Sequence, residues 1–434
     1  MEIKRCYNEQ LKEEMHYAVH PSGLRVYVFP KKGFQKYYAI YGTEYGSIDS
    51  AFQIPGEDTM THVPDGIAHY LEHKMFEEED GSDAFQRFAL TGASSNAFTS
   101  FDMTAYLFSC TDKFYENLDI LLDFVNHPHF TQENVAKEQG IIGQEIKMYE
   151  DDPEWRVFFN TLLALFHNNP VKLDIAGTVE SIAKITPELL YRCYHTFYNP
   201  ANMVLVLVGD VDIQKAMEYV DEHVDAKRNL GQIPREEVVE PTHRVQERIE
   251  QKLMVSQPLF RIGFKDNKMG LDVDAMRKKE IATDLILDAV FGRCSDLYEE
   301  LYEEGLVDTS FDSEADISKG YGFTLIGGES KDPEAVYQRI REHLKGLMET
   351  GIPKEDLDRA RKIWLSRGIR AFNSVEQMGN AFIRQIFAGY EPLAISESLN
   401  QVTDEDVMER LREHFDVDNC VLSVISPMET EKKE

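Results

Sequence analysis

Two histidines and one glutamate within five residues form the part of the sequence best suited to chemistry. His69, Glu72 and His73 lie in the segment His-Tyr-Leu-Glu-His. In a helix, positions three and four residues apart are neighbours, so both imidazoles and the carboxylate would share one face. Imidazole nitrogens are common zinc ligands, and a nearby carboxylate can accept a proton from water. The spacing therefore predicts a metal site that activates water on one face of a helix.

A third metal ligand should come from another helix, because a catalytic zinc ion usually has three protein ligands and one water. Residues 132–149 have a helical pattern despite two glycines, and they include Glu138 and Glu145. These glutamates are seven residues apart, which is two turns along one helical face. From the residues alone either glutamate could bind the metal. The other could then orient His69 or His73 through a hydrogen bond.

The surrounding pattern predicts the elements that would position these side chains. Pro64 and Asp65 favour a helix start, and the apolar residues Ile67, Leu71 and Met75 would lie opposite the histidines. We expect strands at 25–29 and 36–45, helices at 66–76 and 82–90, a strand pair at 93–110 and helices from 112 onward. Such an order predicts an α+β fold.

The motif order resembles that of a known family. His-x-x-Glu-His is the reverse of the common His-Glu-x-x-His and is typical of inverzincins. Seventy-one residues separate His73 from Glu145, which lies in Glu-Gln-Gly-Ile-Ile-Gly-Gln-Glu-Ile-Lys-Met-Tyr-Glu-Asp-Asp. Together these segments resemble the pitrilysin and insulinase-like zinc peptidases, which include the mitochondrial processing peptidase. The resemblance extends over the whole chain and is greatest to short bacterial members that act as half of a two-protein peptidase.

The resemblance implies a role for each site residue. His69, His73 and Glu145 would hold one zinc ion, which would lower the pKa of water towards about 7. Glu72 would be the general base, and Glu138 would orient a ligand from behind. Residues 92–100 resemble the strand beside the family's active site, so Asn96 and Ala97 would bind a peptide as an added strand. The expected activity is that of a zinc-dependent endopeptidase acting on peptides or small unfolded polypeptides.

An internal repeat predicts two homologous domains. Residues 185–210 and 402–427 align without gaps at an offset of 217 residues, half the chain length, and both read as a helix, a turn and a buried strand. The identical pairs are Thr186 and Thr403, Glu188 and Glu405, Asn202 and Asn419, Val204 and Val421, and Leu205 and Leu422. We therefore expect each half to contain a largely antiparallel sheet packed with helices, the two halves enclosing a chamber.

The second half repeats the order of elements without the metal motif. We expect strands at 259–264, 309–315 and 321–328, and helices at 279–291, 296–304, 333–348 and 354–372. The helix at 279–291, which corresponds to the motif helix, contains no histidine. The polar, proline-containing residues 227–244 predict a linker. The expected domains are a catalytic zinc-binding domain at 1–226 and a homologous domain without a metal site at 245–434.

One departure from the family pattern concerns the partner. Active members usually carry an Arg and a Tyr in a second-half segment resembling Leu-Arg-x-x-x-Gly-Leu-x-Tyr, which binds substrate and stabilises the oxyanion. Residues 301–309 are Leu-Tyr-Glu-Glu-Gly-Leu-Val-Asp-Thr, with Tyr302 at the Arg position and Asp308 or Thr309 at the Tyr position. The resemblance therefore implies the zinc subunit of a heterodimer. Its partner would be a homologous chain that lacks His-x-x-Glu-His but carries the Arg and Tyr; a homodimer is an alternative.

Composition restricts the remaining possibilities. A formal net charge of −31 makes nucleic acids and anionic membranes poor partners, because both are polyanions. The five cysteines are scattered without Cys-x-x-Cys spacing, so we expect neither a disulfide framework nor a thiolate zinc site. No signal segment or long apolar run is present, and we expect a cytoplasmic protein. The alternative function is a non-catalytic structural or zinc-binding subunit of a complex.

Overall fold

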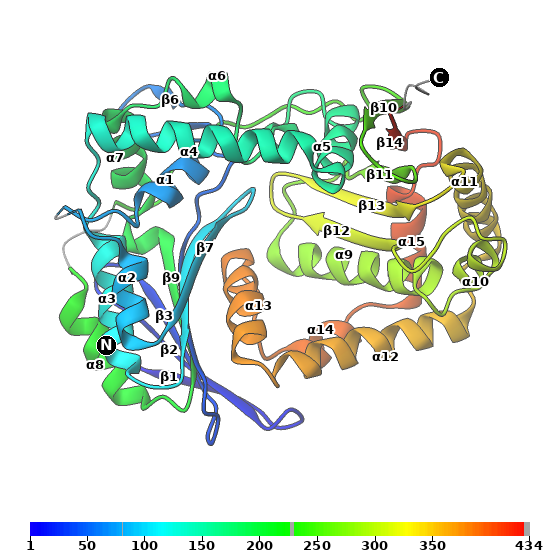
Figure 1. Cartoon of the computed structure of the whole chain (residues 1–434). Coiled ribbons are helices and arrows are strands. Elements are labelled where there is room, and N and C mark those ends of the chain that lie inside the picture. Colours follow the sequence, from blue (N-terminus) through cyan, green and yellow to red (C-terminus); the bar gives the residue numbers. More distant parts are fainter. Residues whose placement is uncertain (80, 226–229, 429–434) are drawn as a thin grey trace. The chain divides into compact units, whose positions relative to one another are not determined.

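The computed structural model describes residues 1–79, 81–225 and 230–428, which form two compact units (Figure 1). Unit 1 consists of Met1–Ile146, Asp174–Glu237 and Ile369–Ala394. Unit 2 consists of Lys147–Leu173, Val238–Gly368 and the chain from Ile395 onward. The two units differ from the contiguous halves expected from the sequence, because each half contributes one segment to the other unit.

Unit 1 is built on a seven-stranded sheet with the strand order β1-β2-β3-β9-β4-β8-β7. Only β3 and β9 run parallel, and the other neighbouring pairs are antiparallel. The strands are β1 (Lys4–Asn8), β2 (Glu13–Val19), β3 (Arg25–Pro30), β4 (Tyr37–Thr43), β7 (Ser94–Thr99), β8 (Thr104–Cys110) and β9 (Met203–Gly209). All seven residues of β9 are buried, as expected for an apolar strand covered on both faces.

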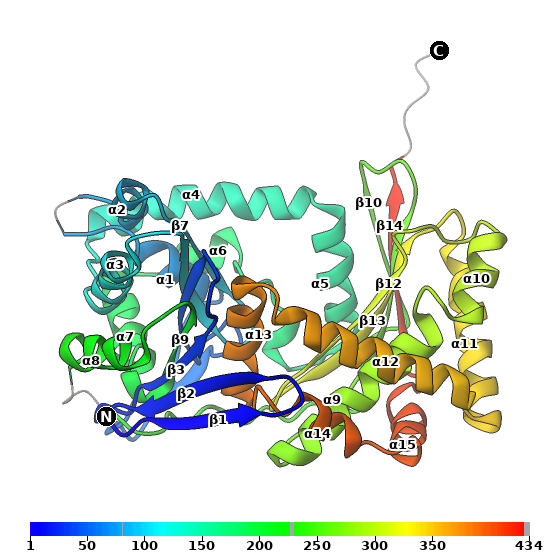
Figure 2. The same cartoon turned by 90° about the horizontal axis from the view of Figure 1, so that it is seen from below.

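Helices cover both faces of this sheet. One face packs against helices from the first half of the chain, and the opposite face packs against α13, which lies against β4 and β9 (Figure 2). The helices are α1 (Ile67–Lys74), α2 (Ala84–Thr91), α3 (Phe114–Asn126), most of α4 (Gln132–Asp151), α6 (Val179–Ile182), α7 (Pro187–Phe197), α8 (Ile213–His223) and α13 (Val375–Ala388). A small hairpin of β5 (Ala51–Gln53) and β6 (Met60–His62) lies outside the main sheet.

Unit 2 contains a five-stranded sheet with the order β10-β14-β11-β13-β12. Its strands are β10 (Arg248–Leu253), β11 (Leu259–Lys265), β12 (Asp312–Ile317), β13 (Gly322–Glu329) and β14 (Val421–Pro427). Its helices are α5 (Pro153–Leu165), α9 (Val273–Ile286, continued as a π-helical turn, Leu287–Phe291), α10 (Asp296–Glu303), α11 (Pro333–Thr350), most of α12 (Lys354–Ala371), α14 (Ile395–Asn400) and α15 (Asp404–His414). Short 3₁₀ turns occur at Pro170–Lys172 in this unit and at Pro200–Asn202 in unit 1.

The two sheets share one topology, which confirms the predicted α+β fold with a duplicated unit. The order β3-β9-β4-β8-β7 in unit 1 corresponds to β10-β14-β11-β13-β12 in unit 2, with one parallel pair at the same place in each. Residues identical in the repeat also have equivalent roles. Thr186 and Thr403 each cap a helix, α7 and α15, by accepting a hydrogen bond from the backbone three residues later.

Each unit receives one helix from the other half of the chain. The helix α5 comes from the first half, yet it packs against β10, β11 and β14. Conversely, α13 comes from the second half and packs so closely on β4 that a side chain at Gly379 would meet the Tyr38 ring at 2.3 Å. The absence of a side chain at this position therefore permits the close approach of helix and strand.

The strand expected at 309–315 begins three residues later, at Asp312. The sequence Asp308-Thr309-Ser310-Phe311 forms a turn, in which the carboxylate of Asp308 accepts hydrogen bonds from the backbone and hydroxyl of Ser310. The strands β1, β2 and β10 were not predicted. The other elements expected in the second half are present, with ends that differ by a few residues, except that α9 already begins at Val273.

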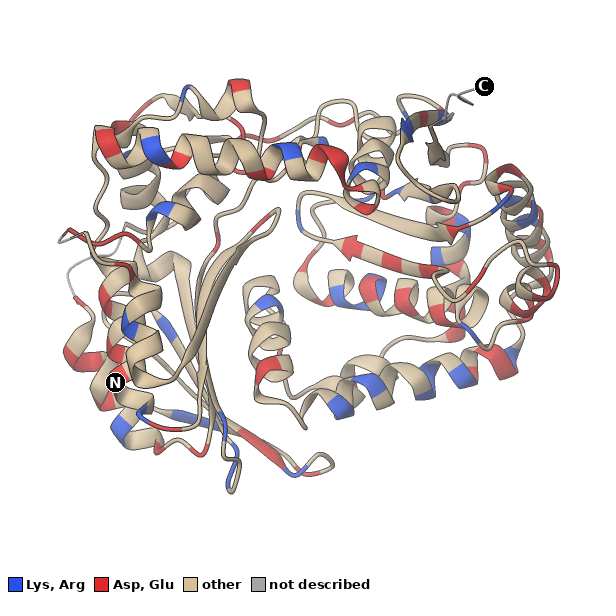
Figure 3. Ribbon diagram, viewed as in Figure 1, with Lys and Arg blue, Asp and Glu red and all other residues tan. Residues whose placement is uncertain are grey.

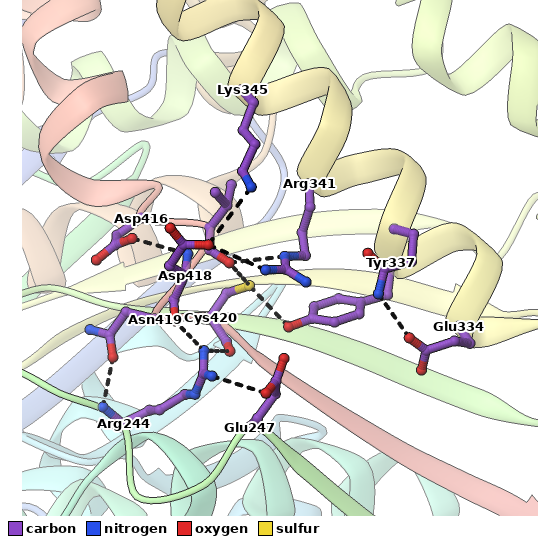
Figure 4. A network of polar contacts seen from close by, with 12 residues as sticks. Arg244, Glu247, Glu334, Tyr337, Arg341, Lys345, Asp416, Asp418, Asn419 and Cys420 are labelled. Atoms are coloured by element: carbon purple, nitrogen blue, oxygen red, sulfur yellow. Dashed lines mark hydrogen bonds and ion pairs between the residues drawn. The ribbon is translucent and has the colours of Figure 1, made fainter.

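The segment that joins the halves is fixed at both ends. Within unit 1, residues 234–236 pair with β5, and the Arg235 guanidinium binds the buried carboxylate of Asp49. Within unit 2, Glu240 accepts backbone hydrogen bonds from residues 167, 168 and 169 and an ion pair from Lys265. Figure 4 shows Arg244 contacting Asn419 and Cys420 in the same unit. The predicted linker thus has more contacts than expected; its residues 227–229 lie outside the described residues.

Charged residues are distributed over both units (Figure 3). Lys and Arg gather along α12, but several pair with neighbouring carboxylates, as Arg361 does with Asp404 and Arg367 with Asp288. This basic helix is therefore largely neutralised by its surroundings. Across the described parts of the chain, no helix combines the length and apolar character needed to span a bilayer.

Candidate metal centre

The start of α1 is set by a close contact between two loops. Gly66 is the N-cap residue with φ 87°, and a Cβ there would meet the carbonyl oxygen of Ala176 at 2.4 Å. The Ser181 hydroxyl donates to the Asp65 carbonyl at 2.8 Å. The helix was expected to start through Pro64 and Asp65, but no side chain caps it. Glycine at position 66 allows the left-handed backbone from which the motif helix begins.

The second helix of the site, α4, runs without a break through both of its glycines. Side chains at Gly140 and Gly143 would meet nothing within 4 Å, so these residues mark neither a turn nor a close packing contact. The helix was predicted at 132–149 and extends over Gln132–Asp151. Because it is continuous, Glu138 and Glu145 lie on the same side and both face α1.

Three side chains converge on one point. The Nε2 atoms of His69 and His73 lie 3.7 and 3.5 Å from the two carboxylate oxygens of Glu145. Ligands of a tetrahedral zinc ion, each about 2.0–2.2 Å from the metal, are about 3.3–3.6 Å apart. In the described parts of the chain, this is the one group of three such residues close enough to share a metal ion. The three side chains therefore fit a zinc ion by distance and by ligand type.

The environment favours a neutral His69. Burial, with the neighbouring His73, lowers the pKa of His69 to about 4, so its ring is uncharged near pH 7. A metal-binding imidazole must be neutral, since its lone pair forms the bond. Its Nδ1 atom is buried and has no hydrogen-bond partner among the described residues. Among the described residues, no protein group therefore orients the His69 ring through a hydrogen bond to Nδ1.

His73 differs because a carboxylate holds its far side. Nδ1 of His73 lies 3.2 Å from Glu138, which directs Nε2 towards Glu145. Burial lowers the pKa of His73, but the bond to Glu138 and the charges of Glu72 and Glu145 outweigh it and raise the pKa. On the far side of Glu138, the fully buried ammonium of Lys74 lies 3.8 Å from the second carboxylate oxygen. Glu138 thus bridges an imidazole and a buried cation.

Glu72 lies beside the converging ligands without joining them. Its side chain is 8% exposed, and burial raises its pKa to about 7, although the hydrogen bond from Thr99 and the charge of His73 lower it. A carboxyl group with a pKa near neutrality can both accept and release a proton. The position of Glu72 and the pKa of its carboxyl group are compatible with a general base next to a metal.

An edge strand and a pocket lie beside this group. β7 ends the sheet of unit 1, and it carries Asn96 and Ala97. The Ala97 N–H donates to the side chain of Asn96 at 2.9 Å instead of to β8, so it faces the open edge. A pocket of about 510 Å³ is lined by these two residues together with Glu72, His73, Phe76, Phe85 and Ile141, among others. Backbone groups at an open edge can pair with an extended peptide.

The structure brings together every residue that the sequence singled out for the site. His69, His73 and Glu145 converge on one point, with Glu72 beside them and Glu138 behind His73. Asn96 and Ala97 lie on the adjacent strand. Sequence reasoning missed Thr99 and Lys74. Thr99 shares a strand face with Ala97, two residues earlier, which is a periodicity signal that could have found it. Lys74 directly follows the motif and precedes the apolar Met75 and Phe76. These apolar neighbours are the sequence signal that could have indicated a buried lysine.

Fold and site together define a class of protein, and comparison with known families agrees. Residues 61–179 match the family described as insulinase (peptidase family M16), and residues 184–363 match the family described as the peptidase M16 inactive domain. The second description agrees with the absence of histidine from α9. The chain belongs to peptidase family M16, as the resemblance implied.

Individual relatives support the same assignment over the whole chain. The chain is 43% identical over 430 residues, 98% of its length and 99% of the other, to a protein of Bacillus subtilis described as the uncharacterized zinc protease YmfH. A crystal structure of a putative M16-like peptidase from Alicyclobacillus acidocaldarius matches with a TM-score of 0.91 and 37% identity, covering 96% of this chain and 99% of that one. Pitrilysin shares the fold at a TM-score of 0.77 and 17% identity, over 99% of this chain and 46% of its own.

Proposed function

We propose that this chain is a zinc-dependent endopeptidase that cleaves peptides or small unfolded polypeptides, and that it is the catalytic subunit of a heterodimer. The observation that carries the proposal is the convergence of two Nε2 atoms on the carboxylate of Glu145, each within 3.7 Å of one of its oxygens, beside a buried glutamate that is not part of the group. A purely structural zinc site usually has four protein ligands, whereas three leave a position open for water. Membership of a peptidase family supports the same function.

The side chains have distinct roles in the proposed reaction. His69, His73 and Glu145 would hold zinc, which supplies Lewis-acid chemistry that acidifies water and polarises a carbonyl group. Glu72 accepts the proton of the attacking water and passes it to the leaving nitrogen. Asn96 and Ala97 hold the peptide extended against β7 through its backbone, which would make affinity depend little on its side chains.

Substitution of the metal ligands and of the base tests this assignment. His69→Ala or Glu145→Gln should remove most of the zinc. Glu72→Gln should keep one zinc per chain and lose at least about 100-fold in kcat, because it removes the base but no ligand. Zinc content by mass spectrometry and cleavage of a broad peptide library measure the two effects.

Two distant residues provide matched controls. His127 is at the end of α3 and Glu133 is in the first turn of α4, both away from the metal group. His127→Ala and Glu133→Gln should retain zinc and activity. Full turnover by Glu72→Gln would rule out the proposed base. Zinc retention by both ligand variants would instead favour another metal site, or the alternative of a non-catalytic structural or zinc-binding subunit.

The heterodimer proposal has its support in residues 301–309. Tyr302, at the position of the family's Arg, is half-exposed at the end of α10, and Asp308 is engaged in a turn with Ser310. The chain therefore lacks the cationic donor in this segment. A donor aimed at the developing oxyanion contributes about 2.7–4 kcal/mol, or about 10²–10³ in kcat. We therefore expect the isolated chain to bind zinc and cleave peptides slowly.

A homologous chain that carries the Arg and Tyr but lacks His-x-x-Glu-His should restore activity. Candidate partners should be mixed with this chain at varied ratios, with cleavage rate as the readout and a maximum expected at one to one. If the chain alone, free of co-purifying protein, is as fast as every mixture, the two-subunit proposal is wrong. If the chain alone has the native mass of two copies and full activity, the homodimer would be favoured. The cytoplasm remains our proposed compartment, and cell fractionation tests it.

A further inference from the structure

The side chain of Glu72 accepts a hydrogen bond from a strand residue that the proposed mechanism does not use. Thr99, the last residue of β7, donates its hydroxyl to Oε2 of Glu72 at 2.6 Å. We propose that Thr99 is a positioning residue: it holds the carboxylate of Glu72 in the orientation needed for proton transfer and so couples the peptide-binding strand to the base. This inference rests on the proposed peptidase function.

The hydrogen-bond network directs the Thr99 hydroxyl towards Glu72. A second hydroxyl, that of Thr104, lies 3.3 Å from Thr99 on the paired strand. Thr104 donates its single hydrogen to the carbonyl of Tyr45 at 2.8 Å. The oxygen of Thr104 can then act towards Thr99 only as an acceptor, and it competes poorly with a nearer carboxylate, because bonds to a charged acceptor are shorter and stronger.

Glu72 has little else to fix its carboxylate. Among the residues that the structure describes, Thr99 is the one side-chain hydrogen-bond partner of Glu72. The final torsion of a glutamate is broad and roughly two-fold, so an unheld carboxylate samples many orientations. A proton acceptor needs its oxygen within hydrogen-bond reach of the water that it activates. One bond at 2.6 Å to Oε2 restricts the torsion and leaves the other oxygen to accept the proton.

The position of Thr99 links the base to the peptide-binding edge. Ala97 and Thr99 are two residues apart on β7, so their side chains lie on the same face of the sheet, the one that contacts α1. The backbone of β7 pairs with β8 on one side only. A peptide added along the open edge would order the strand on its second side. Peptide pairing and orientation of the base would then depend on the same six-residue strand.

Removal and restoration of the hydroxyl test the inference. Thr99→Val keeps the β-branched shape and removes the donor, whereas Thr99→Ser keeps the donor. In the zinc-loaded full chain, with its co-purifying partner if the complex is required, Thr99→Val should lower kcat about 10- to 100-fold. KM should stay within about twofold and zinc at one per chain, because neither strand pairing nor a ligand is changed. Thr99→Ser should recover most of the lost kcat.

Ser95 offers a matched control on the same strand and face. Its hydroxyl makes no hydrogen bond with the described residues, so Ser95→Ala should leave kcat and KM unchanged. In a Glu72→Gln background, Thr99→Val should change the residual kcat by less than about twofold, since its effect passes through Glu72. An equal loss in both backgrounds would overturn the inference.

A readout independent of activity comes from crystal structures of the variants. In Thr99→Val the carboxylate of Glu72 should rotate away or occupy two conformers, and in Thr99→Ser it should keep its place. A single unchanged conformer in Thr99→Val, with kcat within twofold of the unsubstituted protein, would refute the positioning role and leave the proposed function intact. Full turnover by Glu72→Gln would instead refute the proposed base itself.

Discussion

At the scale of single residues, two glutamates of similar sequence surroundings differ in what they face. Glu145 faces the Nε2 atoms of both histidines, whereas Glu138 faces Nδ1 of His73 and the buried ammonium of Lys74. Helical spacing alone placed them two turns apart on one helix and left either as a possible ligand, and the assignment of Glu145 came from the family resemblance. The physical difference lies in the position of α4 relative to α1, which depends on tertiary packing and is absent from local spacing.

This difference predicts a graded response to substitution. Glu138→Gln should weaken zinc binding by about 10- to 100-fold without abolishing it, because His73 loses the group that orients its ring but remains a ligand. Competition with a fluorescent chelator measures the affinity, and Glu133→Gln is the control on the same helix. If Glu138→Gln lost all zinc while Glu145→Gln kept it, the two roles would be exchanged.

At the scale of secondary-structure elements, the sequence predicted the helices and strands of the site better than the tertiary contacts between them. Amphipathic spacing located the motif helix, and alternation located the pair β7 and β8, since both are local signals. The start of α1 at Gly66 depends on the loop around Ala176, more than a hundred residues away, and no local pattern contains that information. The same holds for α5 and α13, whose packing partners come from the opposite half of the chain.

The contact at Gly66 predicts a cost for adding a single methyl group. Gly66→Ala would force a non-glycine residue to φ 87° and bring its Cβ to 2.4 Å from a carbonyl oxygen. We expect a loss of about 1–3 kcal/mol in the free energy of unfolding from backbone strain alone, and more from the clash. Weaker zinc binding should accompany it, because α1 would shift.

Gly33 provides the matched control for this experiment. Its φ is +82° and a Cβ there would meet nothing within 4 Å, so Gly33→Ala introduces the strain without the clash. Denaturant unfolding of both variants and zinc titration measure the difference. Equal destabilisation by the two substitutions would mean that the contact with Ala176 is unimportant.

At the scale of the whole molecule, the segment between the halves is anchored at several points, although most of its described residues are exposed. Residues 234–236 are paired with β5 and Glu240 is held by three backbone N–H groups, whereas Val239 between them is 85% exposed. Limited proteolysis with a protease of broad specificity should therefore cut first at 236–239, within the predicted linker, because exposed backbone with few contacts opens most easily. Mass spectrometry of the fragments locates the cut.

The fragments should remain together after this cut. Each contains a helix that packs in the unit of the other, α5 in unit 2 and α13 in unit 1, so separation would expose both sheets. We expect co-elution in native size-exclusion chromatography and separation in denaturant. Cutting confined to the termini would count against two halves joined at 227–244, and fragments that separate without denaturant would contradict the exchanged packing.

The exchange of helices also bears on how the protein is made. The last strand of the unit 1 sheet ends at Gly209, but the helix that covers its second face is complete only at Ala388, about 180 residues later. At about 5–20 residues per second, a ribosome needs roughly 10–40 s for that length. During this time the apolar residues of β4 and β9 lack their final cover. We therefore expect the nascent chain to bind chaperones that shield exposed apolar surface until α13 has been synthesised and unit 1 can reach its final packing.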